Sequence, residues 1–173
     1  DINNYLTLLF PYTRSITGPD NVKTLKVLQQ IVPLEILEYD SGDNVYDWTI
    51  PDEWNIEDAW IKDANGNIIV DFKENNIHVV GYSKAVNKKI SFKELKENLF
   101  LHHKIPHAIP YRTSYYNKSW GFCVKLSQYK HLEESVGPLE VVIKSKFNPS
   151  GKMAIGELII PGSSKQEILL STY

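Results

Sequence analysis

The sequence predicts an α/β domain, α+β over these 173 residues, that is interrupted by a β-rich insert. Two helical patterns and one strand come first, and strand patterns dominate from Tyr46 onward. One helix signal, beginning at Ser91, stands among those strands. We therefore assign residues 1–43 and 125–173 to the amino-terminal part of an α/β domain, and residues 44–124 to an inserted β-rich domain with one helix.

The first forty residues contain two helical patterns and a strand. Apolar residues recur at helical spacing over residues 2–10, where a proline ends the pattern. A second helix is expected to begin near Pro19, because proline suits the first helical turn, and its apolar positions continue to Ile31. Alternating residues at 34–39 predict the strand that follows.

Local signals place the elements of the insert. Asn65-Gly66 between two apolar runs predicts a β-hairpin, since both residues tolerate a positive φ. Ser91 and Glu94 form a capping box, which predicts a helix from Phe92. Further strands are predicted at residues 77–82, 120–126, 139–143, 154–160 and 167–172. Because Glu167–Tyr173 is apolar and no turn or polar tail follows, we expect it to lead into more of a longer protein.

Composition excludes several classes of function. The net charge of −2 comes from interleaved acidic and basic residues, so we expect no nucleic-acid partner and no membrane partner. No apolar run approaches the roughly 20 residues that span a bilayer. The single cysteine, Cys123, excludes an internal disulfide and fits a reducing compartment. We therefore expect a cytoplasmic protein.

The histidines and the cysteine are the candidate metal ligands. His103 and His107 have the spacing of two ligands on one helical face, but Pro106 between them prevents a regular helix. No cysteine pair or carboxylate completes a zinc set with them or with His102. Cys123 lies in an apolar strand-like run, as a buried and unreactive thiol does. We expect no metal site and no catalytic residue in these 173 residues.

Two loops remain as candidates for substrate binding. Carboxylates surround Trp48 and Trp54, which allows either aromatic anchors that pack the insert or a rim that receives an amine or sugar hydroxyls. Packing is the commoner role of such aromatic strings. The loop over residues 14–18 is rich in donors and could contact an anionic group. The candidate substrate-binding residues are Arg14, Ser15, Thr17, Trp48, Glu53 and Trp54.

Several long motifs carry a family resemblance. They are Phe10-Pro11-Tyr12-Thr13-Arg14-Ser15-Ile16-Thr17-Gly18, Asp47-Trp48-Thr49-Ile50-Pro51-Asp52-Glu53-Trp54-Asn55, Ser114-Tyr115-Tyr116, Trp120-Gly121-Phe122-Cys123 and Gly156-Glu157-Leu158-Ile159-Ile160-Pro161-Gly162. Together they resemble a bacterial family of aminopeptidase-like proteins, often labelled polysaccharide-biosynthesis proteins with an aminopeptidase-like domain. The resemblance implies the fold of the co-catalytic zinc exopeptidases, a sandwich around a mixed sheet, with a β-rich domain inserted into it.

The resemblance also implies a chemistry for the longer protein. Members of such a family would hydrolyse amino-terminal peptide bonds of a peptide or aminoacyl small molecule, with paired zinc ions. Their metal ligands follow the strand equivalent to residues 167–173, so no catalytic or metal-binding role is carried over to this chain. Zinc is expected in the full-length parent alone. The alternative is a non-catalytic binding or regulatory role in surface-polysaccharide biosynthesis, and a homo-oligomer is compatible with either.

Overall fold

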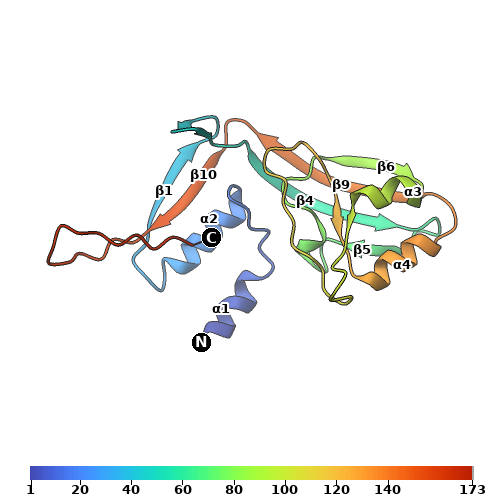
Figure 1. The fold of residues 1–173 in the computed structure, drawn as a ribbon, viewed down its shortest axis with the longest axis horizontal. Helices are drawn as coiled ribbons and strands as arrows, with labels where there is room; N and C mark the ends of the chain where they lie inside the picture. Colours follow the sequence, from blue (N-terminus) through green and yellow to red (C-terminus); the bar gives the residue numbers. More distant parts are fainter. Residues whose placement is uncertain (173) are drawn as a thin grey trace.

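A computed structural model describes residues 1–172, which form two lobes (Figure 1). One lobe, here called the helical lobe, contains α1, α2 and the strand pair β1 and β10. The other, the sheet lobe, contains a four-stranded sheet together with α3 and α4. Helices and strands are thus mixed throughout, as the α+β prediction requires.

The elements of the helical lobe follow the sequence prediction. Helix α1 spans Ile2–Leu9 and α2 spans Pro19–Leu28, with Gly18 as the N-cap of α2. Strand β1 (Glu35–Asp40) pairs in antiparallel fashion with β10 (Lys152–Glu157). Within residues 1–172, every helix is too short and too polar to cross a membrane.

The sheet lobe is built on four antiparallel strands in the order β5-β4-β9-β6. Their bounds are Glu53–Lys62 for β4, Ile68–Asp71 for β5, Val86–Ile90 for β6 and Leu139–Asn148 for β9. The predicted hairpin at Asn65-Gly66 is confirmed, because the turn joins β4 to β5 and Gly66 adopts a φ of 88°. 

Short elements complete the sheet lobe. They are the 3₁₀ turns η1 (Asn76–His78) and η2 (Lys96–Asn98), α3 (Phe92–Leu95), β7 (Leu99–Phe100), β8 (Phe122–Cys123) and α4 (Leu126–Glu134). The separate strand pair β2 (Asn44–Val45) and β3 (Trp48–Thr49) lies beside the end of β1 instead (Figure 1). The capping box of Ser91 and Glu94 is confirmed, although it starts a single α-helical turn that continues as η2. 

The hydrophobic core of the sheet lobe extends past residue 124. Ala59 and Ile61 of β4 pack in one cluster with Leu132 of α4 and with Val141 and Ile143 of β9. Strand β9 also pairs with β4 along its whole length. The cluster therefore includes residues on both sides of the predicted boundary at residue 124.

Four strand predictions are wrong in whole or in part. Residues 77–82 form the turn η1 and two isolated bridges, because Asn75 caps a 3₁₀ turn and Tyr82 takes a φ of 64° that extended chain cannot adopt. The strand predicted at 120–126 is reduced to Phe122–Cys123, and α4 begins at Leu126. 

The other two are the strands predicted at 154–160 and 167–172. Strand β10 ends at Glu157 rather than at residue 160, and residues 167–172 have no regular structure (Figure 1). Ile168, Leu169 and Leu170 are each about nine-tenths exposed. A strand needs a hydrogen-bonded neighbour, and no strand of residues 1–172 lies beside this segment. Tyr173 lies outside the described residues.

The connection between the lobes predicts a glycine requirement. A Cβ at Gly151 would lie 2.2 Å from the Cβ of Glu53, where β9 turns into β10. We expect Gly151→Ala to lower the free energy of unfolding by about 1–3 kcal/mol, the usual cost of overpacking. Gly162→Ala is the control, since open space surrounds that position. Urea denaturation measures the stability of both variants. An unchanged denaturation midpoint for Gly151→Ala would contradict the close approach of Gly151 to Glu53.

Candidate functional site

The two candidate loops predicted from the sequence meet at the junction of the lobes. The Thr17 hydroxyl accepts a hydrogen bond from the Trp54 amide at 3.0 Å and shares a second one with the Tyr82 hydroxyl at 2.5 Å. Gly18 follows with a φ of 95°, and a Cβ there would lie 2.7 Å from the Trp54 carbonyl oxygen. The loop before α2 is thus held against the start of β4.

Trp54 is an internal anchor of this junction. Its side chain is buried, its indole Nε1 donates to the Ser83 carbonyl at 2.9 Å, and its ring stacks on Tyr82 with centroids 5.7 Å apart. Burial raises the pKa of Tyr82 to about 12, so the phenol remains neutral. The polar atoms of Thr17 and Trp54 are therefore engaged within the protein, and these two residues position the surface around them.

The other candidate residues lie around the junction with different exposures. Glu53 is half-buried and accepts hydrogen bonds from the Asn55 amide at 2.8 Å and the Lys152 backbone at 3.2 Å. Ser15 donates to the Thr17 carbonyl at 2.6 Å, and Arg14 is exposed. The indole of Trp48, on β3, donates to the Tyr116 hydroxyl. The structure thus joins Ser15, Thr17, Glu53 and Trp54, while Trp48 belongs to a neighbouring aromatic group. 

That neighbouring group forms a small cavity of about 60 Å³, which we call the aromatic recess. Its side chains come from four separate segments, and they are Asp52, Tyr82, Tyr115, Tyr116, Lys118 and Phe147. Neither Tyr82 nor Phe147 was predicted to lie at a site, because neither lies near the other lining residues in the sequence. The string Ser114-Tyr115-Tyr116 was the one signal that could have indicated it.

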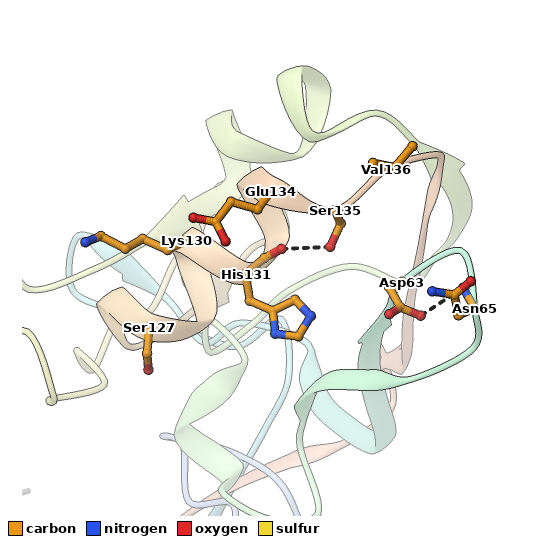
Figure 2. Close-up of a pocket in the computed structure, with 8 residues that line it drawn as sticks. All are labelled: Asp63, Asn65, Ser127, Lys130, His131, Glu134, Ser135 and Val136. Atoms are coloured by element: carbon orange, nitrogen blue, oxygen red, sulfur yellow. Dashed lines mark hydrogen bonds between the residues drawn. The ribbon is translucent and has the colours of Figure 1, made fainter.

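A larger and wider cavity of about 760 Å³, the polar recess, lies between α4 and the turn from β4 to β5 (Figure 2). Figure 2 shows the His131 imidazole projecting from α4 toward the turn that carries Asp63 and Asn65. Asp63 accepts hydrogen bonds from Asn67 at 2.8 Å, which lower the pKa of its carboxyl group. Asp63 is thus engaged in its own turn, and the remaining polar side chains of the recess can offer hydrogen bonds to a polar ligand.

The donor side chains do not fit a zinc site. Within residues 1–172, no three histidine, cysteine or acidic side chains converge on one point. The His78 Nδ1 lies 2.6 Å from the Cys123 carbonyl, and the His102 Nδ1 accepts from the Ile105 amide at 3.1 Å. Burial raises the pKa of the Cys123 thiol to about 12, so it does not ionise as a metal ligand must.

Comparison with known proteins places the chain in a family. Residues 53–146 match the profile of a family described as a domain of unknown function, DUF2172. That match covers more than half of the chain, and it runs through β4, the α3 region, α4 and most of β9. The protein belongs to this family.

One curated relative is a protein of Clostridium acetobutylicum that carries the provisional name polysaccharide biosynthesis protein with aminopeptidase-like domain. It is 46% identical over 176 residues, which cover 100% of this chain and 39% of the relative. A crystal structure of a provisionally named peptidase from the same organism superposes with a TM-score of 0.83 at 42% identity. That match covers 90% of this chain and 36% of the other. The resemblance predicted from the motifs is confirmed.

Removal of the Thr17 hydroxyl should lower the free energy of unfolding by a measurable amount. Thr17→Val leaves the Trp54 amide and the Tyr82 hydroxyl without their buried partner, so we expect a loss of about 2–4 kcal/mol in the free energy of unfolding. Thr17→Ser keeps the hydroxyl and should cost about 1 kcal/mol. Equal losses in urea denaturation would show that the hydroxyl contributes nothing.

His78 predicts a dependence of stability on pH. Burial lowers the pKa of His78 below its ordinary value of about 6.5, and a proton added at Nε2 would face the Gln128 amide donor 3.3 Å away. Below about pH 6.5 the unfolded chain therefore binds a proton that the folded chain does not, so stability falls as the pH falls, by at most about 1.4 kcal/mol per unit.

Urea denaturation between pH 5 and pH 8 measures this effect, within the range where the unfolded imidazole titrates. The slope of stability against pH should be smaller in His78→Gln, and it should be unchanged in His131→Gln, which alters an exposed histidine. Identical slopes for the wild type and His78→Gln would contradict the assignment.

Proposed function

We propose that this chain is part of a zinc aminopeptidase-like hydrolase that acts on amino-terminal peptide bonds of peptides or aminoacyl small molecules. The main support is the 46% identity across the whole chain to a relative named for an aminopeptidase-like domain. The TM-score of 0.83 to a structure named as a peptidase supports the same kind of protein. Fold similarity alone does not fix a substrate, so the substrate class is part of the proposal.

The chain itself has a non-catalytic role in this proposal. Its histidine, cysteine and carboxylate donors do not fit a zinc site, so we assign no catalytic step to them. The chain spans 39% of the clostridial relative. We therefore assign the zinc ions and the hydrolytic chemistry to the part of the full-length protein that corresponds to the rest of that relative.

The exposed apolar side chains indicate where that catalytic part packs. On α1, Ile2, Leu6 and Phe10 are each more than half exposed, although they form one helical stripe. The segment after β10 exposes a further set of large apolar side chains, which are Ile159, Ile160, Ile168, Leu169 and Leu170. A surface this apolar commonly marks an interface. In the proposed protein, the catalytic part covers this surface and the segment after β10 pairs with it as a strand.

The sheet lobe is then a folded accessory module that has its own core. A cytoplasmic location belongs to the proposal as well, supported by the free and buried thiol of Cys123. The alternative, a non-catalytic binding or regulatory protein in surface-polysaccharide biosynthesis, is supported by the name of the clostridial relative. An intact set of zinc ligands in the full-length protein favours the hydrolase, and their loss favours the alternative.

Zinc titration and an aminoacyl-anilide assay test the proposed function. We expect the full-length clostridial relative to bind zinc and to hydrolyse the anilide, with activity removed by a chelator. The 173-residue chain should do neither, because its donors do not converge. Tight stoichiometric zinc binding by the 173-residue chain, or a relative that remains inactive with zinc bound, would overturn the proposal.

A further inference from the structure

The aromatic recess combines three features that point to a ligand. Its cavity is small, with a volume of about 60 Å³. It is walled by aromatic rings, and it carries one acidic and one basic side chain, Asp52 and Lys118. These features together define a site for a very small molecule that is apolar in part and charged at both ends.

The rings of the recess face different directions. Tyr82 and Tyr115 meet edge to face, with centroids 5.2 Å apart and planes at 75°. Tyr82 and Phe147 lie 6.1 Å apart at 56°. Tyr82 contacts both rings, so the three rings form a continuous aromatic wall of the recess, against which an ammonium group can lie. Within residues 1–172, the Lys and Arg groups that lie over rings contact Tyr12, Trp60 and Phe100, so no resident cation occupies the recess rings.

Tyr82 forms the rigid base of the recess. It is buried, and its φ of 64° is a conformation that a bulky residue adopts only where its surroundings enforce it. The Thr17 hydroxyl fixes the phenol, and Trp54 stacks on the ring. The recess is therefore preorganised on one side, while exposed Tyr116 and Lys118 lie on the other.

The two charged side chains determine the class of ligand. Within residues 1–172, neither Asp52 nor Lys118 has an ion-pair partner within 4 Å, and they do not pair with each other. A simple amine would be attracted by Asp52 but repelled by Lys118, and a simple carboxylate would experience the reverse. A ligand with both an ammonium and a carboxylate group satisfies both side chains.

We propose that the aromatic recess binds a small free amino acid, with its ammonium group at Asp52 and the rings and its carboxylate at Lys118. The cavity is small, so glycine, the smallest amino acid, is the probe. The inference deepens the proposed function, because hydrolysis of an amino-terminal peptide bond releases a free amino acid. Its test measures binding alone, so it can fail while the hydrolase proposal stands, and the reverse also holds.

Amide NMR titration of the 173-residue chain with glycine, in phosphate buffer, tests the site. We expect saturable shifts for residues of the recess with a Kd on the order of 1 mM, since so small a ligand makes few contacts. Glycinamide lacks the carboxylate and acetate lacks the ammonium group, so each should bind at least about tenfold more weakly. Glycinamide binding as tightly as glycine would overturn the amino-acid assignment, as would the absence of saturation well above the expected Kd.

Substitutions of the two charged side chains test where glycine binds. Asp52→Asn and Lys118→Gln should each weaken glycine binding by about tenfold. Glu133→Gln and Lys96→Gln make the same charge changes at exposed positions outside the recess and should leave the Kd unchanged. Circular dichroism establishes that each variant is folded, and Lys118 is exposed, so its substitution leaves the core intact. If both recess variants bind glycine as the wild type does, the proposal is wrong.

Discussion

The antiparallel pairing of β4 with β9 is the interaction on which both lobes depend. It runs from Glu53 opposite Asn148 to Lys62 opposite Glu140, and it supports β5 on one side and β6 on the other. The same two strands lead into the helical lobe, because β9 continues through Gly151 into β10 and β4 presents Trp54 to Thr17. Loss of this ladder would remove the sheet and separate the lobes together.

The two lobes bury their apolar side chains to different degrees. In the sheet lobe, the rows of β4 and β9 that face α4 are buried in one cluster. In the helical lobe, Leu9 is the buried residue of α1, while Ile2, Leu6 and Phe10 remain exposed. Exposed apolar area costs about 25 cal/mol per Å² relative to burial. This difference is the physical reason for the proposal that a further part of the longer protein packs on the helical lobe.

Local sequence signals predicted local structure well. Asn65-Gly66 determined its hairpin, and Ser91 with Glu94 determined the start of α3, because both signals act within a few residues. Helix α4 was missed since Lys125 stands at its N-cap, where no Ser, Thr, Asp or Asn marks a start. The strand predicted at 167–172 had the right residue types, but no neighbouring strand of the described chain pairs with it.

Contacts between distant segments could not be read from the sequence. The pairing of β4 with β9 joins residues about eighty positions apart, and no local signal predicts it. Among the candidate site residues, the motif around Trp54 indicated the right region. Tertiary packing makes Thr17 the buried hydrogen-bond partner of Trp54. Tertiary packing also brings Tyr82 and Phe147 to the aromatic recess. A hydroxyl or an aromatic ring in the sequence does not reveal whether it faces a ligand or a neighbour.

Hydrogen exchange on the segment after β10 tests the central claim most directly. In the proposed function, this segment pairs with the catalytic part of a longer hydrolase. In the 173-residue chain, the amides of residues 167–172 should exchange at the rate of unstructured chain, because these residues have no strand partner. In the full-length clostridial relative, the equivalent amides should be strongly protected. Equally fast exchange in both proteins would contradict the claim that this surface is covered by a catalytic part.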